Sequence, residues 1–203
     1  MTKLNLIKSD PDYYRASKKP VKLNLKPLPY LTISGVSAPE DALFSDSIGT
    51  IYPLAFTIKF LCKLNDQDFV MPKMEAFWWV ESELPFNEVP RKEWHWKILI
   101  RMPDFVTKKM ANQARKDLKV KKDLPLLDQI IFEIIHEKTV VQALHLGSYE
   151  EEGPTLEKIY HYIEDNGLEI NGYHREIYLT DPRRTPEERL RTLLRYAVMP
   201  RKT

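Results

Sequence analysis

The order of apolar segments along the chain is the feature that most limits its fold. A strand, a long helix and two further strands occur in this order in each half of the sequence. In the first half these segments are residues 30–36, 48–62, 75–81 and 94–101. In the second half they are residues 140–146, 156–163, 174–179 and 197–199. Although the two halves share little residue identity, this pattern predicts an α+β fold of duplicated strand-helix-strand-strand modules with antiparallel sheets.

Turn and breaker residues suggest where the modules begin and end. Residues 1–27 are rich in Lys, Asp, Tyr and Pro without sustained periodicity, so we expect a peripheral N-terminal arm. One domain follows over residues 28–200. Its first module is expected at about 28–102 and its second at about 129–200, with a linking helix at about 104–118.

Four local features give more detailed expectations. Asp104 is expected to cap the linking helix, and strands 130–135 and 140–146 are expected to pair with each other. Residues 185–188, Thr-Pro-Glu-Glu, form a capping-box pattern that predicts a short helix. Pro53 is compatible with the long helix only in its first turn or at a kink.

Charge and cysteine content exclude several classes of partner and compartment. The 31 Lys and Arg residues oppose 29 Asp and Glu residues, which leaves a formal net charge of +2 and predicts no nucleic-acid binding. The basic stretch 116–122 is typical of a solvated helix end, because Asp117 and Asp123 accompany it. No uncharged apolar run is long enough to span a membrane. The single cysteine, Cys62, excludes an internal disulfide and indicates a reducing compartment, so the cytoplasm is expected.

The sequence lacks the common motifs for metals and cofactors. Its five histidines include no helical His-x-x-x-His pair, and no metal is predicted. It has neither a glycine-rich nucleotide-binding motif nor a Gly-x-Ser-x-Gly turn. We therefore expect no cofactor and no serine-hydrolase mechanism.

One strand carries ionisable side chains on a single face. Alternation over residues 174–179 places His174, Glu176 and Tyr178 on one side of the strand, opposite Arg175 and Ile177. A half-exposed sheet with its polar face in water would explain this pattern without any function. The alternation alone favours this explanation over a ligand site.

Aromatic residues are dense in the two strands of the first half. Trp94 and Trp96 share a face, and Trp79 lies in the adjacent strand. Large rings commonly form structural cores, which is the simplest explanation. As ligand-binding residues we favour Trp79 and at least one of the other two. Further candidates for a lining are Tyr52, Phe56, Tyr149 and His174.

Three stretches together resemble the GyrI-like (gyrase-inhibitor-like) small-molecule-binding family. They are Ala76-Phe77-Trp78-Trp79, Trp94-His95-Trp96-Lys97 leading into Met102-Pro103-Asp104-Phe105-Val106-Thr107, and His174-Arg175-Glu176-Ile177-Tyr178-Leu179-Thr180-Asp181-Pro182-Arg183-Arg184-Thr185. The resemblance extends from about residue 30 to residue 198. It implies a pseudo-symmetric pair of modules around a cleft for drug-like molecules, with Glu176 inside that cleft.

The resemblance also implies what the chain does. Related multidrug sensors carry a DNA-binding helical region before this domain, and the arm before Tyr30 is too short for one, so the chain is not expected to be a transcription factor by itself. Some stand-alone relatives hydrolyse cyclopropane-bearing DNA-alkylating antibiotics, and the sequence looks closest to that branch. In that case Glu176 activates water, and Tyr178 or Tyr149 polarises the dienone oxygen of the substrate.

Two alternatives share the same family assignment. The first is non-catalytic binding, sequestration or sensing of amphipathic, cationic molecules by the same residues. The second is a protein interaction, with DNA gyrase as the partner suggested by the family name alone. A homodimer is one of the assemblies that the sequence leaves open.

Overall fold

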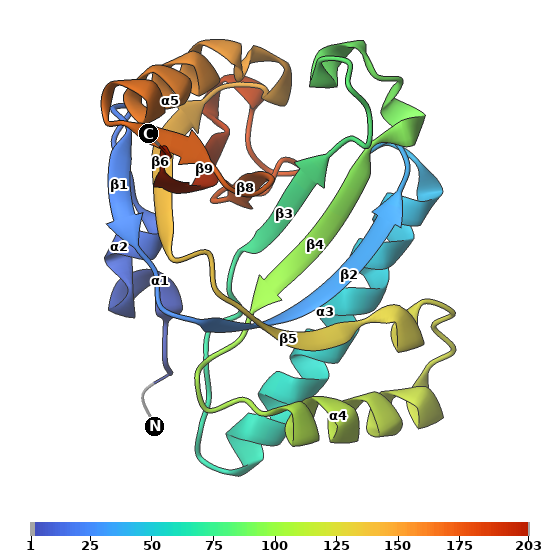
Figure 1. The fold of residues 1–203 in the computed structure, drawn as a ribbon. Helices are drawn as coiled ribbons and strands as arrows, with labels where there is room; N and C mark the ends of the chain where they lie inside the picture. Colours follow the sequence, from blue (N-terminus) through green and yellow to red (C-terminus); the bar gives the residue numbers. More distant parts are fainter. Residues whose placement is uncertain (1–2, 203) are drawn as a thin grey trace. The chain divides into compact units, whose positions relative to one another are not determined.

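Residues 3–202 are described by a computed structural model, in which the chain forms two compact units (Figure 1). Unit 1 contains residues 3–9 and 28–135, and unit 2 contains residues 10–27 and 136–202. No helix among residues 3–202 combines the length and the apolar character that a membrane span requires.

Unit 1 is a four-stranded antiparallel sheet in the order β3-β4-β2-β5. Its elements are α1 (Leu6–Ser9), β2 (Leu28–Val36), α3 (Ala42–Leu64), β3 (Met74–Trp79), 3₁₀ turns at Phe86–Glu88 and Arg91–Glu93, β4 (His95–Arg101), α4 (Lys108–Lys121), a 3₁₀ turn at Leu127–Gln129, and β5 (Ile131–Ile135). Helix α3 packs on β2 and β4 and also contacts α4. Buried positions of α3 such as Ile51, Leu54 and Ile58 form the apolar face that covers the sheet.

Unit 2 is also antiparallel, with the order β1-β6-β9-β8 and with β7 paired to β9 as well. Its elements are α2 (Pro11–Tyr14), β1 (Val21–Asn24), β6 (Thr139–Leu146), a 3₁₀ turn at Tyr149–Glu151, α5 (Gly153–Asp165), β7 (Leu168–Ile170), β8 (His174–Tyr178), a 3₁₀ turn at Glu187–Arg189, and β9 (Arg191–Pro200). Helix α5 packs on β6. Its buried side chains Ile159 and Ile163 join Val141, Ala143 and Leu194 in one apolar core.

The predicted duplication is confirmed in the strand order. In unit 1 the order β2-β4-β3 places the last strand of the module in the middle, and in unit 2 the order β6-β9-β8 does the same. Each module therefore follows the expected strand, helix, strand, strand sequence and closes its sheet by inserting the final strand between the other two.

The N-terminal segment is not the peripheral arm that was expected. Residues 10–27 belong to unit 2, where β1 pairs with β6 and the Tyr13 side chain is fully buried. Arg175 Nη2 donates a 2.7 Å hydrogen bond to the Tyr13 hydroxyl, and Arg195 Nη2 donates a 2.7 Å bond to the Tyr13 carbonyl. The Arg195 guanidinium also lies 4.2 Å from the centre of the Tyr13 ring. Two buried arginines thus hold this segment in place.

The expected pairing of strands 130–135 and 140–146 is wrong. Strand β5 pairs with β2, from Leu28 opposite Ile135 to Thr32 opposite Ile131, whereas both edges of β6 are occupied by β1 and β9. Polar contacts support the observed pairing, because the Thr32 hydroxyl donates a 2.6 Å hydrogen bond to Glu133. Lys97 Nζ lies 3.2 Å from the same carboxylate.

Two helix predictions also need correction. The N-cap of α4 is Thr107 instead of Asp104, and its side chain accepts a hydrogen bond of 3.3 Å from Met110 N. The capping-box pattern at 185–188 produces a single 3₁₀ turn, because the residues that follow are recruited into β9 between two neighbouring strands. The expectation for Pro53 allowed either the first turn or a kink, and the structure places Pro53 well inside α3, beyond its first turn.

Gly35 is required by the packing of Trp96. The two residues are opposite each other in β2 and β4, and a Cβ atom at Gly35 would lie 2.4 Å from Cζ2 of the indole. Trp96 is fully buried, with its ring edge-on to Phe44, and donates a 3.0 Å hydrogen bond from Nε1 to the Ser37 hydroxyl. A methyl group at Gly35 would therefore force the enclosed indole to shift.

We therefore expect Gly35→Ala to lower the free energy of unfolding by about 1 to 3 kcal/mol, as overpacking of a tight core does. Gly49→Ala is the matched control: nothing lies within 4 Å of its added Cβ in α3. That change should stabilise the protein by about 0.5 to 1 kcal/mol through helix propensity. Urea unfolding of both variants measures the difference, and equal stabilities would contradict the packing role of Gly35.

Candidate functional site

Strand β8 separates an ionisable face from a fully buried one. Arg175 and Ile177 are completely buried on one side, as the alternation predicted. On the other side, only 13% of the His174 side chain and 12% of the Glu176 side chain are exposed. The polar face therefore does not lie in open solvent, which removes the simplest non-functional explanation for the pattern.

The buried face of β8 is fixed by an ion pair. The Arg175 guanidinium contacts the Glu137 carboxylate, whose side chain is itself almost fully buried. Together with the hydrogen bond to Tyr13, this contact holds the strand in one orientation. Because successive side chains of a strand point to opposite sides, the same anchor determines where His174 and Glu176 point.

A second carboxylate, which the sequence did not indicate, joins the ionisable face. His174 Nε2 lies 3.3 Å from Glu176 Oε1 and 3.7 Å from Glu152 Oε2. Glu152 immediately precedes α5, and its side chain is nine-tenths buried. These three residues are called the Glu152–His174–Glu176 cluster below.

The turn that carries Glu152 is held by another histidine. His145 is buried, with Nδ1 3.1 Å from the Thr155 hydroxyl and Nε2 2.7 Å from the Ser148 carbonyl. Gly147 lies between His145 and Ser148 in the chain. Its φ of +125° is a backbone conformation that residues with a side chain rarely adopt. His145 therefore has a structural role, and this turn brings Glu152 next to β8.

Burial and charge oppose each other in the cluster. Burial alone would lower the pKa of His174, but contacts with Glu152 and Glu176 outweigh it and raise the pKa to about 9. Burial raises the pKa of Glu152 to about 7, with a further increase from the charge of Glu176. Near neutral pH the cluster therefore contains an imidazolium beside the Glu176 carboxylate, and Glu152 is close to its own titration midpoint.

Four tyrosines surround these charges. The Tyr149 and Tyr178 rings meet edge to face with centroids 5.8 Å apart, and the Tyr160 and Tyr196 hydroxyls are 3.0 Å apart. The Tyr196 ring centroid lies 5.2 Å from that of His174. Burial, followed by the charge of Glu176, raises the pKa of Tyr149 to about 12, and burial also raises the pKa of Tyr196. The phenols of Tyr149 and Tyr196 therefore keep their protons at neutral pH and can donate hydrogen bonds.

The same cluster offers ligand atoms to a cation. One donor atom from each of the three residues lies within 4.8 Å of the others. Metal-binding histidines usually donate their second ring nitrogen to a neighbour, whereas His174 Nδ1 is buried without a hydrogen-bond partner among residues 3–202. Because contacts with Glu152 and Glu176 raise the pKa of His174 to about 9, we interpret the cluster as an imidazolium between two carboxylates.

The predicted tryptophans lie in unit 1 and have different environments. Trp96 is fully enclosed and forms part of the core, with Trp78 and Trp94 in edge-to-face contact nearby. Trp94 precedes β4, and its Nε1 donates a 3.0 Å bond to the Val89 carbonyl. Trp79 lies on the other side of the sheet, partly exposed, with its ring centroid 5.3 Å from that of His95. Of the three, Trp96 has no surface to offer a ligand.

The remaining candidates are distributed between the two units. Tyr52 and Phe56, one turn apart on α3, have ring centroids 6.4 Å apart, and Phe56 is exposed. They belong to unit 1, whereas Tyr149, His174, Glu176 and Tyr178 are gathered in unit 2. Sequence reasoning identified the β8 residues but missed Glu152, Tyr160 and Tyr196.

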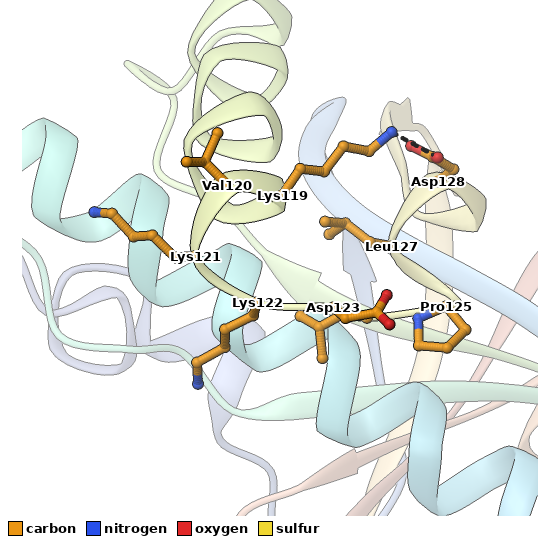
Figure 2. A pocket seen from close by; sticks show the side chains of 9 residues that line it. Lys119, Val120, Lys121, Lys122, Asp123, Pro125, Leu127 and Asp128 are labelled. Carbon is orange, nitrogen blue, oxygen red and sulfur yellow. Dashed lines mark hydrogen bonds and ion pairs between the residues drawn. The ribbon is translucent and has the colours of Figure 1, made fainter.

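Unit 1 also has a hollow of about 590 Å³ at the C-terminal end of α4 (Figure 2). It is lined by the basic stretch up to Lys122 and by the following turn, and Lys119 Nζ makes a 2.7 Å ion pair with Asp128 across it. The lining combines lysines, aspartates and apolar side chains, including Val120, which is largely exposed. We assign no binding or catalytic role to this hollow.

Comparison with known proteins assigns the domain. The profile of the GyrI-like small molecule binding domain matches residues 73–198. Two structures described as hydrolases from Listeria innocua are 28% and 27% identical, with TM-scores of 0.88 and 0.86, over 98% and 97% of this chain and 100% of each of theirs. An uncharacterized conserved protein from the same organism is 29% identical, with a TM-score of 0.91, over 97% of this chain and 100% of its own.

No curated protein sequence matches the chain. The domain profile nevertheless covers more than half of its residues, including strand β8 and Glu152. The chain belongs to the GyrI-like family of small-molecule-binding domains.

Proposed function

We propose that this protein binds planar hydrophobic molecules and hydrolyses cyclopropane-bearing DNA-alkylating compounds, without a cofactor. The observation that carries the proposal is the Glu176 carboxylate, nearly enclosed and placed beside an imidazolium and the protonated phenol of Tyr149. A carboxylate in such surroundings is suited to general-base catalysis, because few water molecules compete for its lone pairs. Two similar structures are described as hydrolases, which supports the same reaction class.

The proposed reaction adds one water molecule to the strained ring. Glu176 takes a proton from water while the water oxygen bonds to a cyclopropane carbon. The ring C–C bond breaks, and its electron pair moves into the conjugated ring, which turns the dienone oxygen into a phenolate. Tyr149 or Tyr178 donates a hydrogen bond to that oxygen, and the proton held by Glu176 finally returns to it. The products contain the atoms of the substrate plus those of one water molecule.

Stacking is proposed to hold the planar substrate. Trp79 is our first candidate because its ring is partly exposed, followed by Trp94, whereas enclosed Trp96 is left out. Offset stacking contributes about 0.5 to 1.5 kcal/mol per ring pair beyond area burial, so a neutral aromatic compound needs no ion pair to bind. Tyr52 and Phe56 remain further candidates for the lining.

Binding without reaction is the second candidate function, and the charge of the cluster favours it. With Glu152 and Glu176 ionised and His174 protonated, the cluster has a net negative charge that would attract a cationic amphiphile. In that case neutralising Glu176 would weaken cation binding, and the ligand would be recovered unchanged.

Mass spectrometry distinguishes the two functions. A cyclopropane-bearing alkylating compound is incubated with the wild-type protein, with Glu176→Gln and without protein. Hydrolysis predicts a product heavier by one water molecule that appears with wild type, falls to the level without protein in the variant, and accumulates over many turnovers. Unchanged compound in all three samples would refute the hydrolase and leave the binding function.

A further inference from the structure

Glu152 and Glu176 both face the same nitrogen atom. His174 Nε2 lies 3.7 Å from an oxygen of Glu152 and 3.3 Å from an oxygen of Glu176. A single N–H group can point fully at only one of them at a time. Among residues 3–202, Glu152 Oε1 and both ring nitrogens of His174 are buried without a well-aligned hydrogen bond, so the two contacts of Nε2 are ion-pair distances. The direction in which the Nε2–H group of His174 points therefore determines which of the two enclosed carboxylates it pairs with.

We infer that Glu152 is a positioning residue for the reaction: by drawing the His174 N–H toward itself, it leaves Glu176 free to accept the proton of water. This inference rests on the proposed function, because it assigns Glu176 the role of general base. Glu152 does not need to touch the substrate. It acts only through His174.

Counting charges shows why an ionised Glu152 is needed. With Glu152 ionised, the cluster has two negative charges and one positive charge, and proton transfer to Glu176 leaves a neutral ion pair between Glu152 and His174. With Glu152 protonated, the same transfer leaves the imidazolium of His174 without a counter-charge in an enclosed site. An uncompensated buried charge is costly, so a protonated Glu152 opposes the proton transfer.

Apart from His174 and Glu176, the groups around Glu152 are uncharged or exposed. On its own turn, Tyr149 stays protonated because burial raises its pKa, and Glu150 is exposed to solvent. From β8 it faces His174 and Glu176, and from β9 it faces Tyr196, whose pKa is also raised by burial. Tyr160 of α5 is held by its hydroxyl contact with Tyr196. The protonation of Glu152 thus responds mainly to the cluster itself, with a smaller contribution from Glu150.

We expect the turnover rate to depend on pH through the ionisation of Glu152. Since burial raises the pKa of Glu152 to about 7, the active, ionised form increases as pH rises through that value. The turnover rate of the wild type should therefore rise between about pH 6 and pH 8. Glu152→Gln, which imitates the protonated form, should remove this rise and lower turnover at pH 8 on the order of tenfold.

Two further variants serve as controls for turnover. Glu150→Gln removes the same charge from the neighbouring exposed position and should keep the rise. Glu152→Asp keeps the charge and should retain most of the rise, which a purely structural role for the glutamate would not predict. If Glu152→Gln retains the wild-type pH profile, the inference is wrong.

The shared proton can also be measured without any substrate. The chain has five histidines, so the ¹⁵N imidazole signals of histidine-labelled protein are assigned by comparison with His174→Gln. In the wild type, the imidazolium of His174 should persist to about pH 9. In Glu152→Gln its midpoint should move down toward the ordinary value, because one of two compensating carboxylates is gone, whereas Glu150→Gln should leave it nearly unchanged. A midpoint that does not move in Glu152→Gln overturns the inference.

The turnover and ¹⁵N measurements distinguish a failure of the role given to Glu152 from a failure of the proposed function. If the wild type gives no hydrated product at any pH, the proposed function fails and the catalytic role of Glu152 fails with it, while the ¹⁵N titration still reports the shared proton. If turnover stops with a chelator and returns with added Zn²⁺, a metal ion occupies the place of the proton and the inference is overturned. A shifted midpoint together with a lost pH rise supports it.

Discussion

Replacing Glu176 by Gln is expected to lower kcat for a cyclopropane-bearing substrate by about 10² to 10⁴, the range that general-base assistance contributes. Glutamine matches glutamate in shape but cannot accept a proton from water. The side chain contacts His174 Nε2 at 3.3 Å in the wild type, and an amide oxygen can keep that contact. The variant should therefore fold normally and lose the chemical step. Single-turnover kinetics at pH 8 measure the change directly.

Substrate binding separates this effect from a damaged site. Stacking of a neutral planar compound does not depend on the charge of Glu176, so its Kd, measured by tryptophan fluorescence quenching, should change less than threefold or so. Tyr149→Phe and Tyr178→Phe identify which phenol stabilises the developing phenolate, because only that variant should also lose kcat. Retained turnover in Glu176→Gln would remove Glu176 from the mechanism.

Replacing Arg175 by Met is expected to lower the free energy of unfolding by about 3 to 5 kcal/mol, the usual effect of breaking a buried ion pair from one side. The guanidinium is fully buried against Glu137, whose side chain is almost fully buried too. Its loss leaves the Glu137 carboxylate without that partner and removes the 2.7 Å hydrogen bond to the Tyr13 hydroxyl. Thermal or urea unfolding measures the change.

A second arginine provides the matched control. Arg183 also makes an ion pair, at 3.0 Å with Asp181, but most of its side chain is in solvent. Arg183→Met should therefore cost no more than about 1 kcal/mol. Adding Glu137→Gln to Arg175→Met should recover part of the lost stability, because it removes the stranded charge. Similar losses for Arg175→Met and Arg183→Met would show that burial does not set the strength of these pairs.

Sequence patterns predicted the features of this protein that depend on local periodicity. The alternation at 174–179 correctly placed Arg175 and Ile177 on the buried side and His174 with Glu176 on the other. The repeated order of strands and helices predicted both modules. These signals are reliable because the spacing of side chains along a strand or helix is fixed by backbone geometry.

Features that depend on distant partners were not predictable in the same way. Glu152 lies in an acidic run before α5, where the helix dipole already explains a negative charge, so nothing in the sequence connects it with His174. The pairing of β5 with β2 joins residues about a hundred positions apart, and no local signal favours it over the nearer β6. At 185–188 the capping-box preference was overridden by the pairing of β9 on both of its edges.

The central position of β9 has a consequence for how the protein is made. This strand pairs with β6, β7 and β8, yet it is the last strand of unit 2 to leave the ribosome, whereas the strands of unit 1 are all synthesised by residue 135. Unit 1 can complete its sheet during translation, but β1 must wait for β6, and β6 must wait for β9. In that interval the edge of β6 that β9 will cover, which includes Val140 and Val141, has no strand partner and is open to pairing with other chains.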